Sequence, residues 1–184
     1  MNILLGFINI IVTFTLVVLI EKLFKKEGFI MEEIKIYNEI INNEMFKQEM
    51  DYVQHGDFSV YEHSLYVANT CLVIAKRLKL NIDRESLIKG ALLHDYFLYD
   101  WHEKEDYHKL HGIRHPKFSR DNAKRDFGLS KKEENMILSH MFPLGKVLPK
   151  YKESVILCIA DKYCATSEIL SSNKVLKKAK SWLI

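Results

Sequence analysis

The sequence predicts an all-α fold, a helical bundle that begins after residue 30. Three observations lead to this prediction. Apolar residues recur at helical spacing along most of the chain, side chains that can cap a helix precede several of these segments, and no segment shows the alternation of a half-buried strand. With 184 residues, the chain is long enough for one domain with a sizeable core. We therefore assign residues 31–184 to a single folded domain.

Composition and charge exclude several classes of function. The formal net charge of +3 is too small to argue for nucleic-acid binding, so we expect no nucleic-acid partner. The cysteines are odd in number and lack Cys-x-x-Cys spacing, which argues against a disulfide framework or a thiolate zinc site. We expect them to be buried, reduced thiols in a domain that faces the cytosol: Cys71, Cys158 and Cys164.

Residues 1–24 are predicted to form a transmembrane helix. Residues 3–20 carry no charge and would span ~27 Å as a helix, close to the ~30 Å of a bilayer core. A secretory signal peptide would need a basic start and a small-residue cleavage site, and neither is seen. A buried helix, or a natural start at Met31 that leaves the protein cytoplasmic, are the alternatives. The positive-inside rule places the domain in the cytoplasm, because a basic cluster follows the span: Lys22, Lys25 and Lys26.

The first half of the domain contains three predicted helices. Residues 31–52 are expected to form one amphipathic helix, and residues 54–57 a turn. Ser59 and Glu62 form a capping box for a helix that reaches about Leu78. The next helix can be N-capped by Asp83 and ends near His94. His55, in the turn, is as consistent with a simple turn residue as with a role in a site.

The second half contains three more helices. His115 and Pro116 are expected to be the N-cap and first residue of a helix that runs to Phe127, where Gly128 ends it. A second capping box, Ser130 with Glu133, opens a helix reaching His140, and the last helix begins at Tyr151 or Glu153. Three further histidines in the loop before His115 are expected to be solvated, although the last of them would compete as a ligand if the helix began earlier: His102, His108 and His111.

Six potential metal ligands are distributed over these helices: His63, His94, Asp95, His115, His140 and Asp161. A buried imidazole or carboxylate costs several kcal/mol unless it is paired, hydrogen-bonded or bound to a metal. The helices of a bundle can bring such side chains together in one core. We therefore expect the six to meet in one cleft. The simpler alternative is that His63 is a satisfied core residue, His115 a helix N-cap and His140 an exposed helix end.

The order His63, His94-Asp95, Asp161 resembles the HD-domain superfamily of metal-dependent phosphohydrolases, over roughly residues 52–167. His115 and His140 resemble the additional ligands of its binuclear members. The resemblance implies a helical bundle in which the first four residues hold one ion, the two additional histidines bring a second, and Asp95 bridges them as the catalytic residue. Relatives that hydrolyse cyclic di-GMP carry a Lys soon after His-Asp and a later Gly-Tyr-Pro element. Neither is present here, which argues against that substrate.

Mixed imidazole and carboxylate ligands suit divalent Fe, Mn, Zn, Co or Ni. Such ions lower the pKa of a bound water and neutralise charge on phosphorus, so we expect hydrolysis of a nucleotide or other small phosphate ester. Lys117 and Arg120 are candidate contacts for its phosphate. The aromatic run 96–101 either packs at the lip of the site or stacks a base. Two alternatives remain, a di-iron oxygenase of the same fold and a non-catalytic, membrane-tethered regulatory module. Substrate, native metal and oligomeric state are not determined by the sequence.

Overall fold

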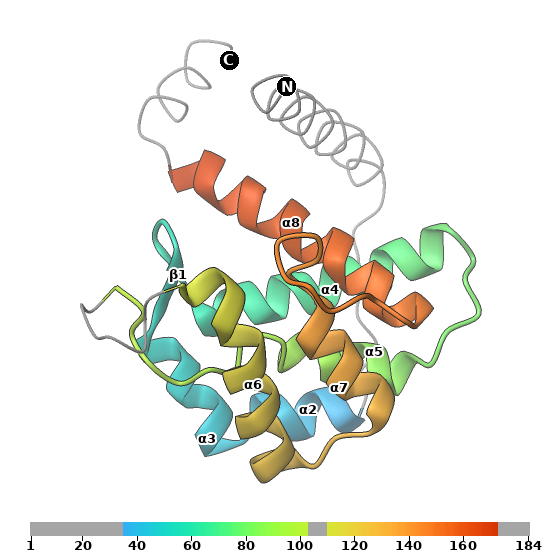
Figure 1. Ribbon diagram of the computed structural model, residues 1–184, viewed down its shortest axis with the longest axis horizontal. Helices are drawn as coiled ribbons and strands as arrows, with labels where there is room; N and C mark the ends of the chain where they lie inside the picture. Colours follow the sequence, from blue (N-terminus) through green and yellow to red (C-terminus); the bar gives the residue numbers. More distant parts are fainter. Residues whose placement is uncertain (1–34, 103–109, 173–184) are drawn as a thin grey trace.

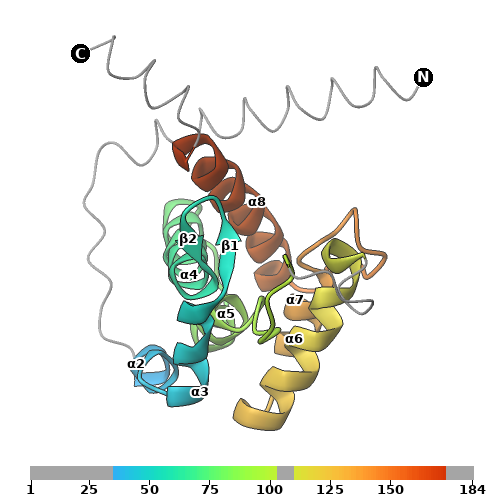
Figure 2. The same cartoon turned by 90° about the vertical axis from the view of Figure 1, so that its left-hand side faces the viewer.

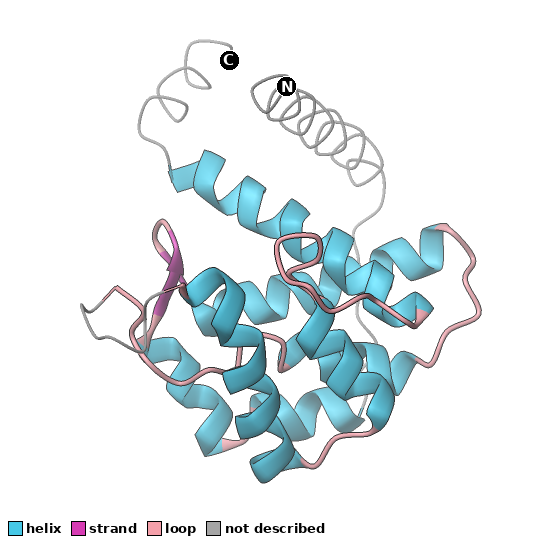
Figure 3. Ribbon diagram, viewed as in Figure 1, coloured by secondary structure: helices cyan, strands magenta, loops and turns pink. Residues whose placement is uncertain are grey.

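The computed structural model describes residues 35–102 and 110–172, and this part of the chain is mostly helical (Figure 3). The N-terminal part contains the short helices α2 (Lys35–Ile41) and α3 (Glu44–Lys47), the 3-10 turn η1 (Gln48–Asp51), and the strands β1 (Val53–His55) and β2 (Phe58–Ser59). The longer helices follow: α4 (Val60–Arg77), α5 (Arg84–Leu92), α6 (His111–Phe127), α7 (Lys131–Ser139) and α8 (Lys152–Ser172).

The helices pack around α5, which lies between α4 on one side and α7 on the other (Figure 2). Helix α8 runs along α4 and also contacts α5 and α7, while α6 packs on α7 at the outside of the bundle (Figures 1 and 2). The core is apolar and drawn from all of these helices. Fully buried examples are Val67 of α4, Leu87 of α5, Met136 of α7 and Leu157 of α8. Burial of such side chains contributes about 1.5–3 kcal/mol each, which holds the helices in register.

The predicted helix caps are confirmed. Glu62 N–H donates to Ser59 Oγ, and Glu62 Oε2 accepts from the Ser59 backbone N–H at 2.9 Å, which completes the first capping box. Ser130 and Glu133 form the second box in the same way. Asp83 caps α5 by accepting from the Ser86 N–H. Gly128 ends α6 with a positive φ of 59°, a conformation that costs glycine no steric clash.

The predicted turn at residues 54–57 is too broad, and a short antiparallel hairpin takes its place. Val53 pairs with Ser59, and His55 pairs with Phe58. Only Gly56 adopts a positive φ, at 62°, so two residues are enough to reverse the chain. The hairpin matters for the site because it turns the side chain of Gln54 inward, where it is buried.

The prediction of one helix over residues 31–52 is wrong. The helix breaks after Ile41, and Asn43 starts α3 with extended backbone, its Oδ1 accepting from the Met45 N–H at 2.8 Å. Adjacent asparagines favour such a break, because their amides compete with the helical backbone for hydrogen bonds.

The start of α6 is also corrected. The helix begins at His111, not at His115, so Pro116 lies inside it, more than one turn from its start. The missing N–H of Pro116 removes the helical bond to the Gly112 carbonyl four residues earlier. The earlier start places His111 and His115 one turn apart on the same face.

No helix in the described ranges is long and apolar enough to cross a membrane. The transmembrane helix predicted for residues 1–24 lies outside these ranges, as does His108.

Candidate metal centre

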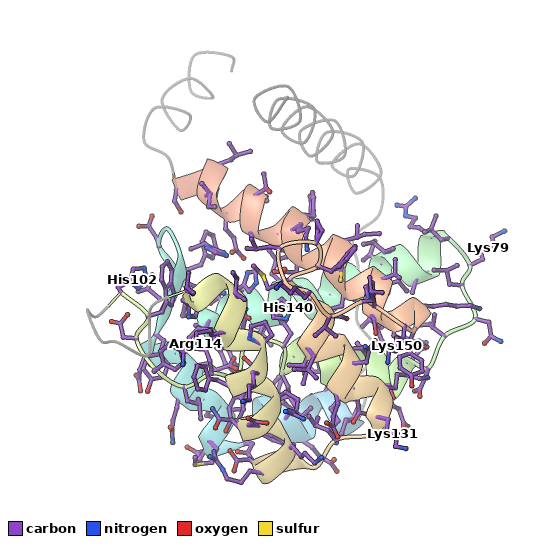
Figure 4. The ribbon with its side chains drawn as sticks, viewed as in Figure 1. Lys79, His102, Arg114, Lys131, His140 and Lys150 are labelled. Atoms are coloured by element: carbon purple, nitrogen blue, oxygen red, sulfur yellow. The ribbon has the colours of Figure 1, made fainter. Side chains whose placement is uncertain are left out.

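The structure brings all six predicted ligands together, and every one of them is buried (Figure 4 labels His140 within the bundle). Helix α4 supplies His63, and α8 supplies Asp161. His94 and Asp95 follow the C-terminus of α5, where the helix has ended and side chains can turn inward. His115 comes from the second turn of α6, and His140 is the C-cap of α7. Five helices therefore position one polar cluster inside an apolar core.

Three of these residues form what we call the inner group: His63, His94 and Asp161. Asp161 Oδ1 lies 3.3 Å from His63 Nε2 and 3.6 Å from His94 Nε2. Two ligands that share one ion at about 2.1 Å stand roughly 3 to 3.4 Å apart. The separations in the inner group therefore suit a shared cation.

The outer group consists of His115 and His140. Their Nε2 atoms are 2.7 Å apart and lie 3.1 and 3.4 Å from Asp95 Oδ1. The other oxygen of Asp95, Oδ2, faces the inner group, 3.4 Å from His94 Nε2 and 3.8 Å from His63 Nε2. One oxygen of the Asp95 carboxylate therefore faces each group.

The histidines are oriented by hydrogen bonds from the far side of each ring. His94 Nδ1 bonds the Ala91 carbonyl, His115 Nδ1 the His111 carbonyl, and His140 Nδ1 the Ile137 carbonyl, all at 2.7–2.8 Å. A carbonyl can only accept, so each Nδ1 carries the proton and each Nε2 presents a lone pair. Such backing of the outward nitrogen is typical of metal-bound histidine.

His63 differs, because its Nδ1 bonds the carboxylate of Glu168 at 2.8 and 3.0 Å. Glu168 is itself 1% exposed, so the contact is shielded from solvent. His55, His63 and Glu168 also lie close enough together to hold an ion. Because Glu168 is bonded to His63 Nδ1, we assign this grouping to the orientation of the inner group and not to a separate site.

The orphaned atoms of the cluster provide a test of whether a metal fits. His63 Nε2, His94 Nε2 and Asp95 Oδ1 are buried and have no hydrogen-bond partner in the described ranges. His115 and His140 also direct two lone pairs at each other across 2.7 Å, which is repulsive unless a cation or proton intervenes. Buried polar atoms in proteins normally have partners, and divalent ions held by the inner and outer groups would supply them. The residues therefore fit a divalent metal.

Burial and neighbouring charges shift the pKa values of several residues in the cluster. Burial lowers the pKa of His63, but the nearby carboxylates of Asp161 and Glu168 outweigh it and raise the pKa to about 10. Burial lowers the pKa of His140 to about 3, with repulsion from His115 adding to the effect. Burial raises the pKa of Asp95, but His94 and His115 outweigh it and hold the carboxyl well below its usual range. Asp95 therefore stays ionised.

Two residues that complete the centre were not predicted from the sequence. Gln54 is buried and donates from Nε2 to Asp95 Oδ2. It comes from the hairpin, so no sequence spacing links it to Asp95. Glu168 follows Asp161 by seven residues, two turns along α8 on the same face, and this spacing could have indicated it.

A cavity of about 850 Å³ opens onto the centre. Asp95, His115, His140 and Asp161 line its inner end, together with Gln54 and His55. Lys117 and Arg120, predicted as phosphate contacts, do not line it. Lys117 is exposed, and Arg120 is paired with Glu134 at 3.0 Å and Asp121 at 2.7 Å. The cation at the cavity is Lys162 of α8.

The aromatic run also reaches the cavity. Trp101 lines it, donates from Nε1 to the Val53 carbonyl at 3.1 Å, and stacks on His111, which in turn stacks on His115. His111 is therefore not a solvated loop residue, as the sequence suggested, but part of the wall. Trp101 also contacts His102, with the two ring centroids 3.9 Å apart.

The model of the HD domain matches residues 60–166, which contain all six predicted ligands. The chain belongs to the HD-domain family, whose members are generally metal-dependent phosphohydrolases acting on phosphorylated small molecules. Searches of curated proteins and of solved structures returned no match. The resemblance seen in the sequence is thus confirmed at the level of the family, and the buried His and Asp groups are candidate sites for divalent metal.

Proposed function

We propose that this protein hydrolyses a small phosphate ester with a pair of divalent ions held by the inner and outer groups. The main support for the proposal is the orientation of the Asp95 carboxylate. Its Oδ1 lies near the outer histidines and its Oδ2 lies near the inner ones. A carboxylate in this position can bridge two ions. When bound, such ions supply an acidified water and neutralise charge that develops on the phosphoryl oxygens.

The protein's own residues do the remaining work. Asp95 stays ionised and can accept a hydrogen bond from the attacking water, which orients it toward phosphorus. Gln54 fixes Asp95 from the hairpin side through its amide. As the water oxygen bonds to phosphorus, the ester oxygen leaves, and a proton from the water ends on the alcohol. The products are the alcohol and inorganic phosphate.

Lys162 is proposed as the contact for the phosphate. Its Nζ donates to the His140 carbonyl at 2.9 Å and to the Cys158 carbonyl at 3.3 Å, which holds the ammonium at the cavity beside Asp161. An ammonium has three donors, so one remains for a substrate oxygen. Among the residues that line the cavity in the part of the chain that the structure describes, it is the only Lys or Arg.

Metal-dependent phosphate release tests the proposed function. Full-length protein is purified without oxygen, loaded separately with Fe, Mn, Zn, Co or Ni, and assayed against a panel of phosphomonoesters, phosphodiesters and nucleotides. We expect release that a chelator abolishes and the metal restores. No release with any metal would contradict hydrolysis. Oxygen consumption by the iron-loaded protein without phosphate release would favour the di-iron oxygenase alternative.

We also propose that residues 1–24 anchor the protein in a membrane with the domain, residues 31–184, in the cytoplasm. The uncharged run at residues 3–20 and the lysines after it support this. The full-length protein should then resist extraction from membranes by alkaline carbonate. Release into the soluble fraction would contradict the anchor.

A further inference from the structure

The lining of the cavity differs in burial and in chemistry from one part to another. The predicted ligands in the lining are buried, and we call this part its inner end, whereas Pro143 and Leu144 are exposed. We call the apolar residues of the lining, with one glycine, its outer wall, and His111 stands beside them: Trp101, Gly112, Met141, Pro143, Leu144 and Ala165.

The outer wall is formed where the start of α6 meets the segment after α7. A Cβ placed on Gly112 would lie 3.6 Å from Leu144 Cδ2 and 3.9 Å from Met141 Cε, so these side chains already cover the glycine. Leu144 nevertheless remains 59% exposed. When a ligand covers such an exposed apolar side chain, apolar surface is removed from water, which favours binding of the ligand.

The charge of the cavity limits the number of phosphates it can accept. Beyond any ions at the ligands, the lining residues within the described ranges offer one Lys or Arg, Lys162, whose ammonium is already bonded to two carbonyls. A triphosphate carries several negative charges along its length, and its outer phosphates would lie against the apolar wall without partners. Burying such charges unpaired is costly. A single phosphate at the inner end has no such conflict.

We propose that the substrate is a phosphate monoester of an apolar alcohol. The inference rests on the proposed function and narrows it. The phosphate lies at the inner end beside Lys162, and the aliphatic or aromatic group lies against Met141 and Leu144. This chemistry could come from a soluble ester or from a lipid phosphate in a membrane.

Binding of alkylphosphonates tests the proposal without turnover, because their phosphorus–carbon bond is not hydrolysed. Calorimetry on the full-length, metal-loaded protein compares methylphosphonate with hexylphosphonate. Each buried methylene strengthens binding by roughly fourfold, so we expect hexylphosphonate to bind at least tenfold more tightly. Leu144→Ser should remove much of this preference and leave methylphosphonate binding unchanged. Leu148→Ser is the matched control, because Leu148 is 60% exposed in the same segment but does not line the cavity.

Equal affinity for the two phosphonates, or a preference that Leu144→Ser leaves intact, would overturn the proposal. Turnover is measured in parallel with hexyl phosphate, AMP and ATP. Faster hydrolysis of ATP would overturn the substrate class while leaving the proposed function standing, whereas no hydrolysis of any ester would remove the function itself. Hydrolysis of phosphatidic acid in phosphatidylcholine vesicles, but not of hexyl phosphate, would support the apolar ester and assign it to a membrane source.

Discussion

The inner and outer groups meet at the same carboxylate but differ in the orientation of one histidine. His63 of the inner group is backed by the buried carboxylate of Glu168, whereas His94 and both outer histidines are backed by neutral backbone carbonyls. A carboxylate partner makes a ligating imidazole more basic and fixes its orientation. The outer histidines also line the cavity, and His63 does not. On the proposed two-ion function, we therefore expect the inner group to bind its ion more tightly. The ion of the outer group should exchange more readily and contact the substrate.

The largest expected effect follows from a substitution at Asp95, the residue that faces both groups. Asp95→Asn keeps the size of the side chain but removes the charge that faces both groups. We expect phosphate release to fall roughly a thousandfold, because charge stabilisation at the reacting phosphorus is lost. Circular dichroism should show the same helix content as the wild type. Asp121→Asn, an exposed residue of α6 that pairs with Arg120, serves as the control and should keep full activity. Wild-type turnover by the Asp95 variant would show that the reaction occurs elsewhere.

A second variant sharpens the difference between the groups. Glu168→Gln keeps a hydrogen-bond acceptor for His63 but removes the negative charge. The affinity of the inner group for its ion should fall by about 10- to 100-fold, while that of the outer group stays the same. Competition with a calibrated chelator measures both. Glu85→Gln, an exposed residue of α5, is the matched control. If both affinities fell equally, the distinction between inner and outer groups would be lost.

The smallest expected effect concerns Glu49, which is buried near Asp95 and whose carboxylate oxygens have no hydrogen-bond partner in the described part of the chain. Burial raises the pKa of Glu49 well above 4.5, and the charge of Asp95 raises it further. An acid with a raised pKa in the folded state stabilises the fold fully below its unfolded pKa. That contribution is lost as pH rises from about 4.5 through the folded pKa.

Glu49→Gln removes this pH dependence while keeping the shape of the side chain. In chelated protein, the variant should gain thermal stability over the wild type by a few degrees between pH 5 and pH 8. Bound ions beside Asp95 would offset the negative charge, so the gain should shrink in the metal-loaded protein. If the melting temperatures of the two proteins changed in parallel across this pH range, a raised pKa for Glu49 would be contradicted.

The parts of the fold that depend on local chemistry were predictable from the sequence. The caps at Ser59, Asp83 and Ser130 lie where the capping residues indicated, because a cap is made within four residues. The break at Asn43 and the early start of α6 were missed. The break was missed because apolar periodicity continues past Asn43, whose amide caps α3. The start of α6 was missed because Pro116 was expected at the first position of the helix, whereas it lies inside.

That the six predicted ligands would meet in one cluster was predictable, because their residue types and order resemble those of a known family. Gln54 was not, since its contact with Asp95 spans 41 residues and depends on a hairpin that the pattern did not reveal. The residues of the cavity wall also could not be predicted from the sequence. Leu144 and Gly112 meet only after α6 and α7 have packed together.

Metal content tests the central claim most directly. Elemental analysis compares full-length wild type with the double variant His115→Ala, His140→Ala, both purified with metal supplied. The account predicts about two ions per chain in the wild type and about one in the variant, since the inner group remains complete. Phosphate release should be lost in the variant with its helix content retained. Equal metal content in the two proteins, or a wild type that binds none, would contradict a centre shared by the two groups.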